Sequence, residues 1–115
     1  MFEARVDLQR LVRDIAARQV EWDAVALGWR VSPIKANFGK AVVTADGESP
    51  THLVSIVAWV SGELDLDVAR TADSLVVAKH YDLVADAEFD RVLDEVLIFL
   101  RDGVEPSGGV VSVLP

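Results

Sequence analysis

The sequence predicts a single α+β domain in which an N-terminal helix and a C-terminal helix pack on one face of a mostly antiparallel sheet of about five strands. Three observations predict it. The chain has 115 residues, enough for one hydrophobic core without disulfides. Apolar residues recur with a helical period near both ends and with strand-like runs between them. No linker or internal repeat divides the chain, so the whole of residues 1–115 is expected to fold as one unit.

The first expected element is a helix over residues 1–22. From Val6 to Ile15 the apolar side chains recur at three- and four-residue steps, and arginines occupy the other side. One apolar stripe therefore faces the core.

The sheet is expected within residues 24–84, where the period changes. The runs "AVALGWRVSPI" and "GKAVVTADG" predict two strands separated by turn-forming residues. The Asp46-Gly47 pair suits a tight hairpin, although Pro50 favours a longer connection. Residues 52–60 are apolar on both alternating sets, which predicts a central strand covered on both faces.

The remaining elements follow the same logic. Residues 63–69 alternate between apolar and mostly acidic side chains, which is typical of a strand with one solvated face, and another strand follows the turn at 71–73. A second helix is expected over residues 86–102, with Asp86 as its N-cap and Gly103 as its stop. The remaining residues, 104–115, form either a flexible tail or an edge strand.

Composition limits the function classes. The chain has no cysteine, which excludes disulfides and thiolate chemistry and favours the cytoplasm. No apolar run has the roughly 18 residues of a membrane span, and no signal-peptide core opens the chain. The net charge of −8 arises wholly from residues 62–115. A negative charge of this size repels nucleic acid and attracts a basic protein. The same charge also serves solubility, so both interpretations stay open.

Five residues are candidates for partner binding. Glu63, Asp65 and Asp67 alternate along one predicted strand and would form a ladder on its solvated face. Trp59 is expected mainly in the core, whereas Trp29, beside a glycine and an arginine, is expected to be partly exposed. An exposed tryptophan near acidic strands is typical of an interface hot spot. The acidic row is thus either a wet strand face or a docking surface for a basic partner.

The sequence predicts neither catalysis nor a bound metal or cofactor. Carboxylates two apart on a strand lie roughly 6.5–7 Å apart along the chain, which is too far to chelate one ion closely without ligands from elsewhere. His52 and His80 stand in different predicted strands, without the short spacing typical of zinc sites. No serine has the context of a nucleophile elbow.

Three consecutive segments resemble a known family. They are "VAWVSGELDLDVAR", with its W-x-S-G-E-x-D pattern, then "SLVVAKHYDL" and "AEFDRVLDEVLIFLRDG". Together, over residues 52–102, they resemble small immunity proteins of bacterial polymorphic toxin systems, of the TriTu type. The resemblance implies a cytosolic antidote that binds and blocks a secreted toxin domain, without catalysis of its own, and it makes Trp59, Glu63, Asp65 and Asp67 the residues to test.

Other functions remain open. A secretion chaperone that holds an effector segment is also small, acidic and α+β, and is usually a dimer. An enzyme would need a pocket with convergent polar groups near His52 or His80. A domain that self-associates through the free face of its sheet is a third possibility, so a homodimer is possible under more than one of these interpretations.

Overall fold

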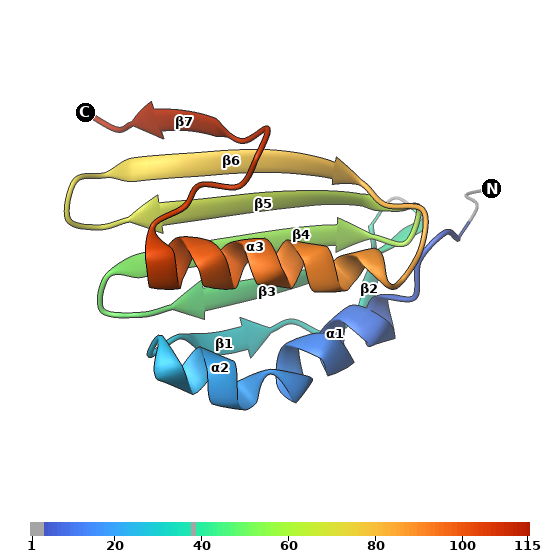
Figure 1. Cartoon of the computed structure of the whole chain (residues 1–115). Helices are drawn as coiled ribbons and strands as arrows, with labels where there is room; N and C mark the ends of the chain where they lie inside the picture. The colour runs from blue at the N-terminus through green and yellow to red at the C-terminus, as the bar shows by residue number, and fades with distance from the viewer. Residues whose placement is uncertain (1–3, 38) are drawn as a thin grey trace.

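A computed structural model, which describes residues 4–37 and 39–115, confirms the α+β class. One antiparallel sheet of seven strands carries all of its helices on one face (Figure 1). In chain order the elements are α1 (Leu8–Ala17), α2 (Gln19–Ala24), β1 (Gly28–Val31), β2 (Lys35–Asn37), β3 (Lys40–Glu48), β4 (His52–Trp59), β5 (Glu63–Arg70), β6 (Leu75–Asp82), α3 (Glu88–Asp102) and β7 (Val110–Val113).

The strands follow one another as a meander. Their order across the sheet is β1-β3-β4-β5-β6-β7, and β2 pairs with β3 beside β1. The expected strand count was about five. The two additional strands are the three-residue β2 and the four-residue β7, which lie at opposite edges and are too short to show a clear period in the sequence. Of the two alternatives for residues 104–115, the edge strand is therefore the one observed.

The N-terminal helix differs from the single helix expected over residues 1–22, of which 1–3 lie outside the described residues. The chain leaves the helical conformation at Arg18, whose N–H bonds to the carbonyl of Ile15, and α2 begins one residue later. This break turns Trp22 into the core, where its indole N–H donates to the Ile15 carbonyl at 2.8 Å. Asp7 caps the start of α1 by accepting from the N–H of Gln9.

The Asp46-Gly47 pair is not a hairpin turn. Both residues lie inside β3, and the turn falls at residues 49–51 instead. There the Ser49 hydroxyl accepts hydrogen bonds from the N–H groups of Thr51 and His52, which fixes the reversal. Ser49 and its neighbours thus supply the turn chemistry that the sequence pattern suggested for Asp46-Gly47.

The C-terminal helix ends as expected but begins differently. Gly103 has a φ of 72° and terminates α3, as the sequence predicted. Asp86 is not the N-cap, because Ala87 occupies that position without a side-chain cap. The Asp86 carboxylate instead accepts from the N–H of Asp7 at 2.7 Å, which ties the start of α3 to the start of α1.

The core fills the space between the sheet and the helices. Alternate side chains of β3 to β6 face α1, α2 and α3, and the largest fully buried side chains are Trp22, Phe89, Phe99, Leu11, Ile56, Leu64, Leu66, Leu83 and Leu93. The helix α3 lies over the middle of the sheet and runs roughly along the direction of its strands (Figure 1). Within residues 4–37 and 39–115, no helix combines the length and the apolarity that a membrane crossing requires.

None of the helices in the described part of the chain covers the opposite face of the sheet. The expectation that residues 52–60 are covered on both faces is therefore wrong: Leu53 is 49% exposed, and Ser55, Val57 and Trp59 are half-buried. The strand is apolar on both of its faces, but only one of them meets the helices.

Candidate functional site

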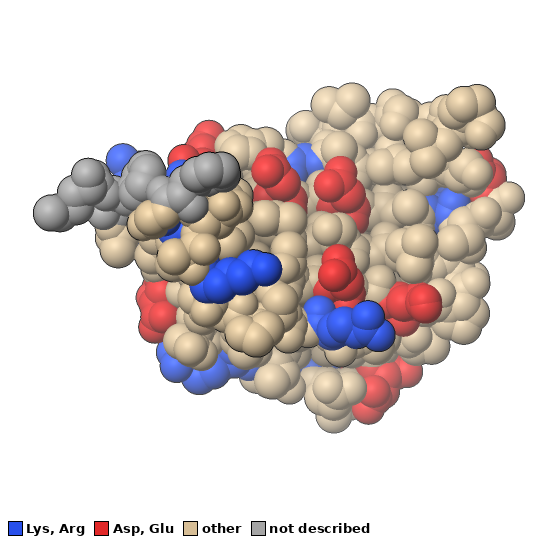
Figure 2. Space-filling view, turned by 180° about the vertical axis from the view of Figure 1, so that it is seen from behind, with Lys and Arg blue, Asp and Glu red and all other residues tan. Residues whose placement is uncertain are grey.

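The candidate site lies on the uncovered side of the sheet, which we call the open face. Side chains alternate along a strand, so the residues that point away from the helices can be identified from the core positions. Figure 2 views this side and shows carboxylates spaced over a largely uncharged surface. The charged members of the open face are Arg30, Lys35, Lys40, Asp46, Glu48, Glu63, Asp65, Asp67 and Asp82, and His80 lies among them.

The predicted acidic row does lie on the open face, but its first member is already engaged. Glu63 pairs with Lys40 at 3.1 Å and accepts a hydrogen bond from the Ser61 hydroxyl. The Ser61 hydrogen bond, with a smaller contribution from Lys40, lowers the pKa of Glu63 to about 2. The Lys40 ammonium also lies 5.3 Å from the centroid of the Trp59 ring. At this end of the row, the Glu63 carboxylate is therefore already paired within the protein.

The second member of the row is engaged as well. Asp65 Oδ1 lies 2.7 Å from Nδ1 of His80 on the neighbouring strand, and Asp82 Oδ1 lies 3.0 Å from Nε2 of the same ring. These hydrogen bonds, that of Asp65 first, raise the pKa of His80 above its ordinary value of 6.5. The imidazole therefore offsets part of the charge of two carboxylates.

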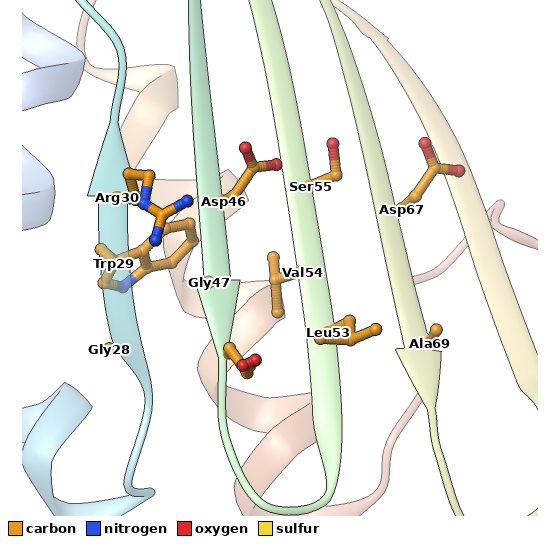
Figure 3. Close-up of a pocket in the computed structure, with 11 residues that line it drawn as sticks. Gly28, Trp29, Arg30, Asp46, Gly47, Leu53, Val54, Ser55, Asp67 and Ala69 are labelled. Carbon is orange, nitrogen blue, oxygen red and sulfur yellow. The ribbon is translucent and has the colours of Figure 1, made fainter.

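Asp67, the third member, differs because it lines a cavity on the open face. Two adjacent rows of cross-strand neighbours form this cavity, Arg30-Asp46-Ser55-Asp67 and Gly28-Glu48-Leu53-Ala69, running over β1, β3, β4 and β5 (Figure 3). Its volume is about 590 Å³. The space exists because Gly28, Ser55 and Ala69 have small side chains where their neighbours have large ones. We call the cavity lined by these two rows the hollow.

The carboxylates of the hollow are unpaired, in contrast with the rest of the row. No hydrogen bond or ion pair joins the side chain of Asp46, Glu48 or Asp67 to another residue within the described part of the chain, and the same holds for the side chain of Arg30 at the end of the row. Three free carboxylates and one guanidinium thus surround an exposed leucine, Leu53.

This arrangement suits a basic side chain. A carboxylate accepts two parallel hydrogen bonds from a guanidinium, and the apolar stem of an arginine or lysine packs well against an aliphatic surface. In the hollow, Leu53 and Ala69 supply that surface, and Asp46 and Asp67 flank Ser55 on opposite sides. The groups that line the hollow are therefore complementary to a cation with an apolar stem.

Only one of the two candidate tryptophans lies on the same face of the sheet as the acidic row. Trp59 lies on the open face, half-buried, whereas it was expected mainly in the core. Trp29 is half-buried, and its ring packs edge-on against the core residue Trp22, with centroids 5.2 Å apart and planes at 71°. Trp29 forms part of the lining of the hollow, but its indole nitrogen is buried and has no hydrogen-bond partner. Trp29 is thus mainly a core residue on the helix side.

Sequence reasoning missed Arg30, Asp46, Glu48 and Leu53. The pattern around Asp46 suggested a turn, and the others had no local pattern that set them apart. The signal that unites them is strand register, which places Arg30 opposite Asp46 and Asp46 opposite Ser55. Register is a property of paired strands, and no single local run of residues encodes it.

Within the described residues, neither histidine belongs to a group of side chains that could hold a metal ion. His52 is 9% exposed, packs edge-on against Phe99 and contacts the Thr51 hydroxyl, and burial lowers its pKa. Among residues 4–37 and 39–115, no group of three or more histidine, cysteine, aspartate or glutamate side chains is placed to hold a metal ion. His80 is exposed and bonded to two carboxylates.

Comparison with known proteins does not identify a relative. No family model matches the chain, and no curated protein or solved structure is significantly similar to it. The resemblance of residues 52–102 to TriTu-type immunity proteins therefore stays a prediction. A functional proposal rests on the geometry and the charge of the open face.

Proposed function

We propose that this protein is a non-catalytic cytoplasmic binding protein that blocks a secreted toxin domain, and that it docks a basic surface of that domain on its open face. The observation that supports the proposal best is the hollow, where Asp46, Glu48 and Asp67 are unpaired around Leu53. Ionised carboxylates that have no partner within the protein do not stabilise the fold through ion pairs. They remain available to bind a basic partner.

The charge of the whole chain supports the same partner class. A net charge of −8 accelerates the encounter with a cationic protein and slows the approach of nucleic acid. Many toxin domains that act on nucleic acids are cationic, so an acidic protein that covers such a surface also competes with the substrate. Inhibition would then be occlusion, with no reaction catalysed by this chain.

The sheet makes the hollow a rigid receptor. Its four strands are held in register by the backbone pairing of β1 with β3, β3 with β4, and β4 with β5. A partner residue that enters the hollow therefore meets groups already in place, which lowers the conformational entropy lost on binding. An inserted arginine would desolvate both its own stem and Leu53, as hot-spot residues do.

Affinity capture from the source organism, with the tagged protein as bait, tests this function. We would compare the wild type with a hollow variant, Asp46→Asn, Glu48→Gln and Asp67→Asn combined. The control variant removes three exposed acids elsewhere, through Glu21→Gln, Asp23→Asn and Glu105→Gln.

The proposal expects one basic polypeptide to be recovered by the wild type and by the control variant, and lost by the hollow variant. Equal recovery by all three baits would place binding away from the hollow. Recovery of unfolded or apolar client segments, unaffected by the three charges, would favour the secretion-chaperone alternative instead.

A further inference from the structure

We infer that two copies of this chain pair through the free edge of β7 and form one continuous antiparallel sheet. This inference does not depend on the proposed function, because β7 lies at the edge of the sheet farthest from β1 and the hollow (Figure 1). The binding partner of the β7 edge is a second copy of the same chain.

The edge of β7 has unused hydrogen-bonding groups. Within the described residues β7 pairs with β6 alone, with Val111 opposite Val77 and Val113 opposite Leu75. The N–H of Leu114 donates to the carbonyl of Ser74 and therefore points toward β6. Backbone groups alternate along a strand, so those of Val111 and Val113 point away from β6 into solvent. The occupant of this edge must itself be an extended strand.

The side chains of β7 are also unusually apolar for an exposed edge. All four residues of the strand are exposed, including Val110 at 70% and Val113 at 65%, and Leu114 beyond it is 57% exposed. From residue 106 to residue 115 the chain contains no charged side chain. Proteins usually protect an edge of this kind with lysine, proline or a covering loop.

The opposite edge of the sheet has such protection. It is divided between the short strands β1 and β2, which both pair with β3, and Pro33 lies between them. Arg30 lies within β1 and Lys35 within β2, and both side chains are exposed. Arg30 and Lys35 place charges within the strands of one edge, whereas residues 110–114 at the other contain neither a charged residue nor a proline, since Pro106 and Pro115 lie outside them. This contrast distinguishes a blocked edge from an edge open to association.

The pattern of β7 suits a copy of itself. Residues 110–114, Val-Val-Ser-Val-Leu, have the same apolar pattern in both directions around Ser112. A two-fold axis at Ser112 places Val111 of one copy opposite Val113 of the other, and Val110 opposite Leu114, as an isologous interface requires. No like charges face each other across the pairing, despite the net charge of −8 on each chain.

The register also fixes the geometry of the interface. Val111 and Val113 of one copy would exchange backbone hydrogen bonds with Val113 and Val111 of the other. The two Ser112 residues would then be a non-hydrogen-bonded pair, with Cα atoms about 4.5 Å apart. The two-fold axis is perpendicular to the sheet, so both helix layers lie on one side and both hollows lie on the other.

Two measurements test the pairing on the full chain. Sedimentation velocity over a concentration series should show the wild type passing from monomer to dimer. Val113→Lys should stay monomeric, because it places ammonium groups next to an uncharged partner strand and repels the second copy. The matched control is Val20→Lys on α2, where Val20 is 83% exposed, and this variant should dimerise like the wild type. Thermal unfolding of each variant verifies that it is folded.

Cysteine cross-linking then tests the register. The chain has no cysteine, so Ser112→Cys introduces a single thiol per copy. At about 4.5 Å between Cα atoms, two such thiols fit disulfide geometry. Diamide should convert Ser112→Cys to a covalent dimer much faster than the exposed control Ser107→Cys. A wild type that is monomeric at every soluble concentration would overturn the inference, as would a dimer that Val113→Lys leaves intact or that cross-links equally at both positions.

Discussion

Nδ1 of His80 on β6 lies 2.7 Å from Oδ1 of Asp65 on β5, in a cross-strand pair on the open face. This contact divides the acidic row of β5. The carboxylate of Asp65 is hydrogen-bonded to the imidazole. The carboxylate of Asp67, two residues further along the strand, makes no hydrogen bond or ion pair within the described residues, and it borders the hollow. The surface that we propose for docking therefore begins at Asp67, the member of the row whose carboxylate is unpaired.

The two histidines should titrate on opposite sides of their ordinary pKa of 6.5. The carboxylates of Asp65 and Asp82 raise the pKa of His80, and burial against Phe99 lowers that of His52. A two-dimensional NMR titration of the imidazole signals measures both. Asp65→Asn should lower the pKa of His80 and leave that of His52 unchanged. A single shared pKa for both rings would contradict this account.

The same shifts predict opposite pH dependences of stability. His80 has a raised pKa in the folded state, so its contribution is complete below pH 6.5 and disappears as the pH rises through the folded-state value. His52 has a lowered pKa, so its contribution is complete above pH 6.5 and disappears as the pH falls. In urea unfolding, the destabilisation by His80→Asn should become smaller as the pH rises above 6.5, and the destabilisation by His52→Asn should become smaller as the pH falls below 6.5.

The cluster between β6 and α3 should be worth more than surface ion pairs. Glu95 accepts from Lys79 at 2.9 Å and from the hydroxyl of Tyr81, and the side chains of Lys79 and Glu95 are only 15% and 18% exposed. Glu95→Gln should lower the free energy of unfolding by about 2–3 kcal/mol, because it leaves Lys79 unpaired in a partly buried place. Tyr81→Phe should cost about 1 kcal/mol.

An exposed pair gives the comparison for this cluster. Asp73 bonds to Arg70 at 2.7 Å on the surface, where the two side chains are 51% and 37% exposed. Asp73→Asn should destabilise the fold clearly less than Glu95→Gln in the same urea titration, since solvent screens exposed pairs. Equal losses would mean that the Glu95 cluster is no stronger than a surface pair.

Gly62, in the turn between β4 and β5, should not tolerate a side chain. Its φ is 106°, and a Cβ there would lie 2.2 Å from the carbonyl oxygen of Leu83. Gly62→Ala should therefore cost at least about 2 kcal/mol from strained backbone and steric clash. Gly103→Ala is the control, because φ is 72° but nothing lies within 4 Å, and its loss should be about 1 kcal/mol. Thermal or urea unfolding separates the two.

Neutralising the hollow should leave the fold intact. The carboxylates of Asp46, Glu48 and Asp67 pair with nothing in the described chain, so their conversion to amides removes mutual repulsion and breaks no hydrogen bond. The hollow variant should unfold at the same temperature as the wild type or slightly higher. A marked loss of stability would show that these carboxylates serve the fold.

Local patterns were sufficient for much of the fold but not for the site. The alternation of residues 63–69 and the left-handed Gly103 depend on neighbours in sequence, and both are as predicted. Asp86 is not the N-cap of α3 because its carboxylate accepts a hydrogen bond from the backbone N–H of Asp7, which is 79 residues away in the sequence. The hollow likewise depends on register among four strands, which brings Arg30 and Asp67 into one row.

Isothermal titration of the captured basic polypeptide, purified, into the wild type, the hollow variant and the control variant tests the central claim most directly. We predict that the control variant binds like the wild type and that the hollow variant binds at least about tenfold more weakly, a loss of about 1.4 kcal/mol. We also predict that wild-type affinity falls as ionic strength rises. Equal affinities for all three proteins would contradict the assignment of the hollow as the site that receives a basic partner.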